Sequence, residues 1–149
     1  MTPYVTKCLP KEDIFLFSRI ERAVQRLPDI DLGEDEDGRK ILLSCHILAR
    51  AVARVFKVRT EDGFLVGGRC RSEHAWVVTK TGNIIDVYPV AVLGGPLLID
   101  NRESVSPMQF LYSISPGMQE KYRDFFSRES FQRSVRTITK ALRSAAKKD

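Results

Sequence analysis

The sequence has little of what holds small secreted proteins together and nothing that would anchor a protein in a membrane. Its 149 residues include three cysteines, Cys8, Cys45 and Cys70. This small, odd number argues against a disulfide framework and favours a reducing compartment. No apolar run reaches the roughly 18 residues of a membrane-spanning helix, and the first residues lack the basic-then-apolar order of a signal peptide. We therefore expect a cytoplasmic protein that makes no contact with a membrane.

Metal-binding motifs are also missing. The chain has no Cys-x-x-Cys pair, and an acidic loop at residues 29–38 lacks the residue spacing of a calcium site, so we interpret it as a solvated loop. The sequence still permits one zinc site. Its ligands would be Cys45, Cys70 and His74, with either His46 or Asp86 as the fourth. Adjacent residues on one helix are poorly placed to bind the same ion. We expect neither a metal nor a cofactor.

The positive charge of the chain is concentrated at its C-terminal end. The whole excess of +5 lies in residues 128–149, which hold seven Lys or Arg and two Asp or Glu. A basic C-terminal helix at about residues 128–147 can bind an acidic protein or a nucleic acid. No nucleic-acid motif or aromatic stacking platform accompanies it, so a solvated helix face is the simpler interpretation. The apolar stripe of this helix comprises Phe131, Val135, Ile138, Leu142 and Ala145.

The composition and the apolar periodicity predict one mixed domain. Apolar residues make up 43% of the chain and charged residues 29%, as in an ordinary soluble protein, and 149 residues suffice for a single domain. Helices are predicted at residues 11–27 and 40–56 and, in two pieces, through the last third of the chain. Strands are predicted within residues 57–67, at 74–79 and at 83–88, with residues 90–107 irregular. This order predicts an α+β fold in which helices flank a small antiparallel sheet.

Two of the predicted strands form a hairpin, and its register decides whether two polar side chains meet. His74 opens the first strand and Asp86 lies near the end of the second. A two-residue loop would place these side chains on opposite faces of the hairpin. A three-residue loop at residues 80–82, with Gly82 in the left-handed conformation, makes them diagonal neighbours on one face. The carboxylate can then fix the tautomer of the imidazole and stabilise its charged form.

A cysteine upstream of the hairpin is the candidate nucleophile. Cys45 follows Ser44, a favoured N-cap residue, and precedes an apolar helical run. If the helix begins there, the dipole and the N–H groups of its first turn stabilise a thiolate. If it begins near residue 38, Cys45 is an ordinary core residue. His46 is predicted on a side face, about 100° around the helix, and Cys70 is a second, weaker candidate nucleophile.

These segments resemble the transglutaminase-like branch of the papain-fold cysteine peptidases. The matching residues are Cys45 in LLSCHILARAV, His74 in EHAWVV and Asp86 in GNIIDVYP. The same block, about residues 42–89, is similar to the cysteine peptidases that mature lasso peptides. The resemblance implies a papain-like core with extra C-terminal helices and a Cys45–His74–Asp86 triad. It also implies a hydrolase or acyltransferase that acts on a peptide or protein amide by hydrolysis, deamidation or transamidation.

Two other interpretations remain open. The domain can be a non-catalytic interaction module on the same fold that binds a nucleic acid or an acidic protein through its basic C-terminal helix. It can also be an inactive relative in which the triad survives as structure. Trp76, two residues after His74, either packs in the core or contacts substrate.

Overall fold

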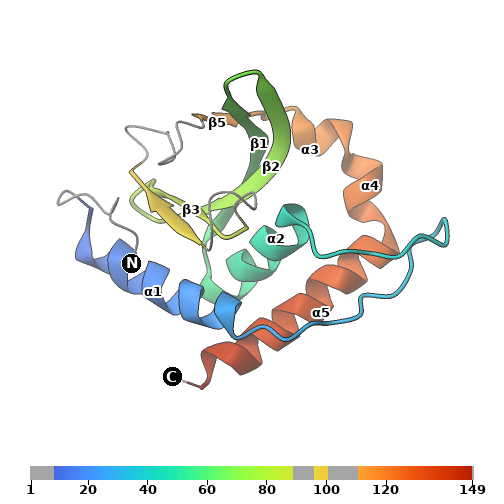
Figure 1. Ribbon diagram of the computed structural model, residues 1–149, viewed down its shortest axis with the longest axis horizontal. Helices are drawn as coiled ribbons and strands as arrows, with labels where there is room; N and C mark the ends of the chain where they lie inside the picture. The colour runs from blue at the N-terminus through green and yellow to red at the C-terminus, as the bar shows by residue number, and fades with distance from the viewer. Residues whose placement is uncertain (1–8, 89–95, 101–110, 149) are drawn as a thin grey trace.

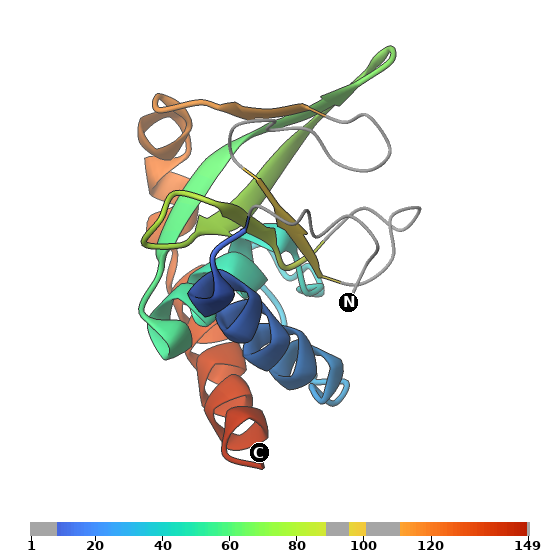
Figure 2. The ribbon, with the colours of Figure 1, turned by 90° about the vertical axis from the view of Figure 1, so that its left-hand side faces the viewer.

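The computed structural model describes residues 9–88, 96–100 and 111–148 (Figure 1). These residues form a curled antiparallel sheet with helices α1, α2 and α5 packed below it (Figure 2). The helices are α1 Lys11–Gln25, α2 Cys45–Phe56, α3 Met118–Lys121, α4 Arg123–Ser127 and α5 Glu129–Ala146. The strands are β1 Arg59–Gly67, β2 Cys70–Val78, β3 Ile84–Asp86, β4 Leu97–Ile99 and β5 Leu111–Ile114. The predicted α+β class is confirmed. None of the helices in these ranges combines the length and the apolar character required to cross a membrane.

The sheet has the strand order β4-β3-β2-β1-β5 in the part of the chain that the structure describes. β1 and β2 form a long hairpin that extends beyond the helices, whereas β3 and β4 are short (Figure 2). Three strands differ from prediction. β2 begins at Cys70, so His74 lies within this strand and does not open it. β4 lies in a segment expected to be irregular, and β5 in a part expected to be helical. Both are too short to show a clear two-residue period, and β5 buries Tyr112 alone among its residues.

Successive side chains of the central strands point to opposite faces of the sheet, so their apolar residues belong to two separate clusters. On one face of the sheet, Ala75 and Val77 of β2 pack with α1, α2 and α5 in the larger cluster. On the other face, Trp76 and Val78 belong to a smaller cluster that includes Tyr112 of β5. α2 therefore lies between the sheet and α5, at the centre of the molecule (Figure 1).

The start of α2 is set by a polar cap. The helix begins at Cys45, not at residue 40, because Ser44 has extended backbone angles of φ −117° and ψ 164°. The Ser44 hydroxyl accepts a hydrogen bond from the N–H of Ile47 at 3.3 Å. This cap satisfies one of the donors that the first turn leaves without an intrahelical partner. Cys45 is thereby placed in the first turn, as the nucleophile hypothesis requires.

The acidic loop lies against the N-terminal end of α5. Glu36 accepts hydrogen bonds from the backbone N–H of Ser130 at 2.9 Å and from its hydroxyl at 2.5 Å. Arg133 donates to the carbonyl oxygens of Leu32 and Glu34. The loop is exposed along most of its length, as a solvated loop should be, and one of its carboxylates also caps α5. The apolar stripe predicted for this helix is confirmed, with Phe131, Val135, Ile138, Leu142 and Ala145 all buried.

Gly63 lies where β5, β1 and the Trp76 ring meet, and a side chain there would collide with its neighbours. It pairs with His74 of β2 and with Ile114 of β5. A Cβ atom on Gly63 would lie 2.1 Å from the carbonyl oxygen of Ser113 and 2.8 Å from the Trp76 ring. We expect Gly63→Ala to lower the free energy of unfolding by about 1–3 kcal/mol, because backbone and a buried ring must both move.

Urea unfolding checks this prediction. Gly117→Ala is the matched control, because nothing lies within 4 Å of a Cβ at that position and its φ of −76° suits alanine. We expect the control to keep the stability of the wild-type protein. Equal stabilities for the two variants would contradict the prediction.

Candidate active site

The turn between β2 and β3 has the three-residue loop on which contact between His74 and Asp86 depends. Its register is given by the pairs Val77–Ile85 and Val78–Ile84. The N–H of Thr79 donates to the carbonyl oxygen of Asn83 at 2.9 Å, which closes the loop at residues 80–82. Gly82 has a φ of 89°, a left-handed conformation that glycine adopts without strain. The predicted register is confirmed.

A buried carboxylate of α1 holds this turn. Asp13 is 2% exposed and accepts hydrogen bonds from Thr79 Oγ1 at 3.1 Å, from Asn83 Nδ2 at 2.7 Å and from the hydroxyl of Thr81. These three donors form and flank the loop, so α1 helps to fix the register of the hairpin. No sequence pattern indicates this contact, which joins residues as much as 70 positions apart.

His74 and Asp86 form a buried ion pair. His74 Nε2 lies 2.9 and 2.8 Å from the two oxygens of Asp86, which is fully buried. Asp86 also accepts a hydrogen bond from the hydroxyl of Tyr112 at 2.6 Å and one from the N–H of Tyr88 at 3.3 Å. Burial alone would lower the pKa of His74, but hydrogen bonding to Asp86 and to Cys45 outweighs it and raises the pKa to about 10. The ring is therefore an imidazolium at neutral pH.

Cys45 interacts with two imidazole rings from its place at the start of α2. The thiol is half-buried. Burial raises its pKa, but hydrogen bonding to His46 and to His74 outweighs burial and lowers the pKa to about 6. Because Nε2 of His74 faces Asp86, Nδ1 is the nitrogen left for the sulfur. The structure thus brings together the three side chains that the sequence predicts as a triad.

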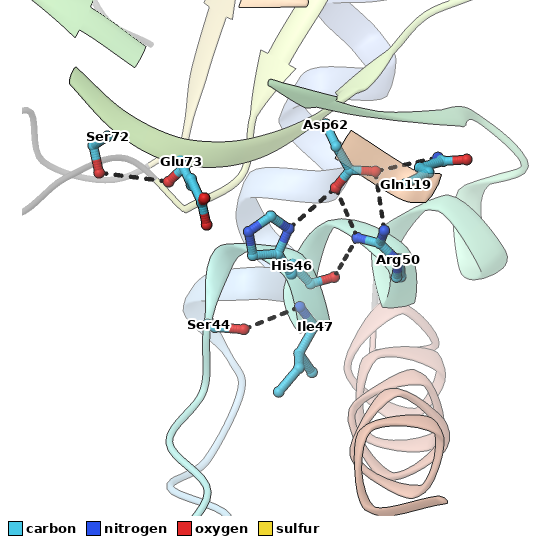
Figure 3. A network of polar contacts seen from close by, with 8 residues as sticks. All are labelled: Ser44, His46, Ile47, Arg50, Asp62, Ser72, Glu73 and Gln119. Atoms are coloured by element: carbon cyan, nitrogen blue, oxygen red, sulfur yellow. Dashed lines mark hydrogen bonds and ion pairs between the residues drawn. The ribbon is translucent and has the colours of Figure 1, made fainter. Parts of the chain in front are cut away.

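A second histidine–carboxylate pair begins at the next residue of α2 (Figure 3). His46 Nδ1 lies 3.1 Å from Asp62 of β1. Arg50, one turn further along α2, binds the same carboxylate with two N–H groups at 3.1 and 3.0 Å. Figure 3 shows Gln119 of α3 reaching Asp62 as well, with a hydrogen bond of 3.2 Å. His46, predicted only as a side-face residue, thus has a carboxylate partner that the sequence did not indicate.

The charges of this second pair stabilise each other. Burial alone would lower the pKa of His46, but hydrogen bonding to Asp62 and then to Cys45 raises it to about 9. Burial alone would raise the pKa of Asp62, but His46 and Arg50 lower it to about 2. The ring of Phe126 covers both cations, with its centroid 5.4 Å from the His46 ring and 4.2 Å from the Arg50 guanidinium. All three ionisable groups are therefore charged at neutral pH.

Part of this cluster has a sequence signal. His46 and Arg50 are four residues apart, a spacing that places two side chains on one face of a helix. Asp62 is the second of two adjacent acidic residues in a strand, and nothing local indicates that it, and not Glu61, turns toward α2. Tyr112, the partner of Asp86, belongs to the strand that the apolar pattern does not reveal. Sequence reasoning missed Asp62, Tyr112, Arg50 and Gln119 as members of the site, and of these only Arg50 has a local signal.

Two other predicted site residues lie away from the sulfur. Trp76 is fully buried, with its ring edge-on to Tyr112 and its Nε1 donating to Glu61 at 3.0 Å, so it supports the site from the core and presents no surface to a substrate. Cys70 is exposed at the tip of the β1–β2 hairpin, four residues along β2 from His74. Among the side chains that the structure describes, no cluster of His, Cys, Asp or Glu is placed to hold a metal ion.

Two cavities border α2 near its start. One of about 190 Å³ is lined by Ser44 and by apolar side chains that include the exposed Leu42 and Phe125. The other, of about 520 Å³, lies against Arg50 and Gln119. The first touches the residue before Cys45, and neither of the two is lined by the thiol itself.

The arrangement is suited to nucleophilic attack on a carbonyl carbon. A thiolate beside an imidazolium is an activated nucleophile. The backbone N–H groups of Cys45 and His46 lie in the first turn of α2, where no intrahelical carbonyl faces them, and can bind an oxyanion.

Comparison with protein family models, with curated proteins and with solved structures finds no match to this chain. A function is therefore inferred from the geometry of the site.

Proposed function

We propose that the protein is a cysteine-dependent hydrolase or acyltransferase that acts on amide bonds. Cys45 is the nucleophile, His74 is the acid–base group, and Asp86 orients His74. The proposal depends above all on the half-buried thiol at a helix N-terminus, next to an imidazolium that a buried carboxylate holds. Buried ion pairs are weak stabilisers of a fold, so two of them beside one thiol of low pKa favour a role in chemistry.

The reaction follows from the positions of the protons. In the resting site the proton of Cys45 resides on His74. The thiolate attacks the amide carbon, a C–S bond forms, and the oxyanion binds the N–H groups at the start of α2. As the C–N bond breaks, His74 gives its proton to the leaving amine. Water or a second amine then loses a proton to His74 and attacks the thioester, which breaks the C–S bond and restores the thiolate.

A papain-like core of the transglutaminase-like type is part of this proposal. Its support is the order of the elements: a helix with Cys45 at its N-terminus is followed by antiparallel strands that carry His74 and then Asp86. This is the order of the family that the sequence resembles. Helices α3, α4 and α5 are then the extra C-terminal helices.

The substrate class that fits this chemistry is a carboxamide of a peptide or protein. The cavity beside Ser44 has an apolar wall and can take an apolar side chain of such a substrate. Hydrolysis, deamidation and transamidation share the same thioester and differ in the leaving group and in the acceptor.

Binding of a nucleic acid or an acidic protein by α5 has weaker support. Two arginines near the start of this helix already have partners within the protein. Arg128 lies 3.4 Å from Asp37, and Arg133 donates to backbone carbonyl oxygens. Arg136 is paired with Glu129 on the helix surface. A binding module would also have no use for a thiol of low pKa.

Trapping of the acyl-enzyme tests the proposal. The protein is treated with p-nitrophenyl acetate at neutral pH, and the modified peptide is identified by mass spectrometry. We expect an acetyl group on Cys45 that is lost again as water hydrolyses the thioester. Acetylation confined to Cys70 or to lysines would contradict the proposal, as would acetylation of Cys45 that is equally fast in His74→Gln.

A further inference from the structure

The proposed reaction uses His74 alone as the acid–base group. The second buried pair beside Cys45, formed by His46 and Asp62, has no role in that reaction. His46 follows Cys45 directly on α2, faces Asp62 at 3.1 Å and is 15% exposed. Arg50 already binds both oxygens of Asp62, which is enough to neutralise this carboxylate. A further buried cation is costly unless it has an anion of its own. The extra histidine therefore calls for an explanation that Asp62 does not supply.

The two pairs differ in their net charge. Among the described residues, the charged and titratable groups that interact with the sulfur, with the two rings or with the carboxylates that hold the rings include Cys45, His46, Arg50, Asp62, His74, Asp86 and Tyr112. Asp86 balances the charge of His74. Asp62 faces two cations, so the cluster around it keeps one positive charge. The thiolate of Cys45 is the anion that would neutralise this cluster.

The direction of proton transfer agrees with this distribution of charge. The surplus positive charge lies beside Cys45, whereas the negative charge of Asp86 is bonded to the nitrogen of His74 that faces away from the sulfur. A proton that moves from Cys45 to His74 therefore moves away from cations and toward a carboxylate. Burial raises the pKa of the thiol, and of the two rings that oppose burial, His46 has the larger effect.

We propose that His46, clamped by Asp62, is a second cationic partner of Cys45 that donates a hydrogen bond to the thiolate and keeps its own proton throughout the reaction. The inference rests on the proposed function and adds an electrostatic group to it. When the C–S bond forms and the C–N bond breaks, the amine takes its proton from His74, and no proton leaves His46. His74 is thus required at every pH as the proton carrier, whereas His46 acts only by lowering, together with His74, the pH above which the thiolate exists.

The alkylation rate of Cys45 as a function of pH tests this role. Cys8→Ser and Cys70→Ser leave Cys45 as the sole thiol for iodoacetamide. We expect His46→Gln to raise the apparent pKa of the thiol by about one to two units, which lowers the thiolate fraction near pH 6.5 by about three- to 25-fold and slows alkylation accordingly. In alkaline solution the variant should react at least as fast as the parent protein, because a thiolate of higher pKa is the better nucleophile.

The matched control and the His74 variant separate the possible outcomes. Arg54→Gln removes a cation from the exposed side of α2 and should leave the profile unchanged. Profiles of His46→Gln and the parent protein that cross with rising pH support the inference. A His46→Gln profile that equals that of the parent, while His74→Gln moves it, overturns the inference and leaves the proposed function standing. If neither variant moves the profile, both fail.

If His46→Gln does not fold, an NMR titration of the two histidines in protein that keeps both still tests the inference. The chain has two histidines, so two ring C2–H signals in an NMR titration give both pKa values. Alkylation of Cys45 removes the thiolate that faces both rings. We expect both pKa values to fall by about one unit or more. A fall for His74 alone overturns the inference, whereas a fall for neither histidine contradicts the proposed function as well.

Discussion

Cys45→Ala is expected to abolish acyl transfer, with a loss on the order of 10⁴- to 10⁶-fold, and to leave the fold intact. The sulfur is the atom that forms the acyl bond, so its removal ends the covalent route. The fold should survive because alanine suits a helix and because the Ser44 cap does not involve the thiol. Release of p-nitrophenol from the acetyl ester and the Tm measure the two effects.

Cys70→Ala is the matched control for this variant. It makes the same chemical change at an exposed thiol on the tip of the β1–β2 hairpin. We expect its acyl transfer to equal that of the wild-type protein. If the two variants lost activity equally, or if Cys45→Ala kept it, Cys45 would not be the nucleophile.

Asp86→Asn is expected to lower the free energy of unfolding by about 3–5 kcal/mol below pH 6.5 and to slow acyl transfer by about 10²- to 10⁴-fold. The substitution keeps the shape of the side chain but leaves the imidazolium of His74 buried without its anion. The ring also loses the acceptor that fixes its orientation toward Cys45. Asp86 thus contributes to both the fold and the proposed chemistry.

The stability change should depend on pH. Against the lowering effect of burial, hydrogen bonding to Asp86 and, to a smaller extent, to Cys45 raises the pKa of His74 from 6.5 to about 10. A raised pKa contributes stability that is fully present below 6.5 and is lost as the pH rises through 10. The difference between the wild-type protein and Asp86→Asn should therefore shrink over this interval in urea unfolding. A difference that stays constant with pH would contradict the ion pair.

Tyr112→Phe is the matched control for Asp86→Asn. It removes one hydrogen bond to Asp86 but keeps the carboxylate and its contact with His74. We expect a smaller loss, of about 1.5–3 kcal/mol, because the bond is made to a charged acceptor. The pH dependence of stability should remain that of the wild-type protein.

The parts of the site that the sequence predicts are those fixed by local rules. A glycine at the end of a three-residue loop determines the hairpin register, and the structure has that register with Gly82 in the left-handed region. A serine before an apolar helical run determines where α2 begins, and Cys45 follows Ser44 as its first residue. Both rules involve residues that are a few positions apart, so they can be applied to the sequence without knowledge of the fold.

The parts that the sequence does not predict depend on contacts between distant segments. Asp62 meets His46 only because β1 packs over α2, and Tyr112 meets Asp86 only because β5 joins the far side of β1. β5 itself buries one side chain, so its burial does not produce a recognisable period. Of the two interpretations of Trp76, the structure supports packing in the core, because the ring is wholly buried although it is next to the site in sequence.

The pH dependence of Cys45 alkylation tests the central claim most directly, because it measures the nucleophile without knowledge of the substrate. In protein with Cys8→Ser and Cys70→Ser, we predict a rate that rises with an apparent pKa near 6, where hydrogen bonding to His46 and His74 outweighs burial. His74→Gln should move that pKa upward. A rise centred near 9, the ordinary value for a thiol, and insensitive to His74→Gln would contradict a catalytic Cys45.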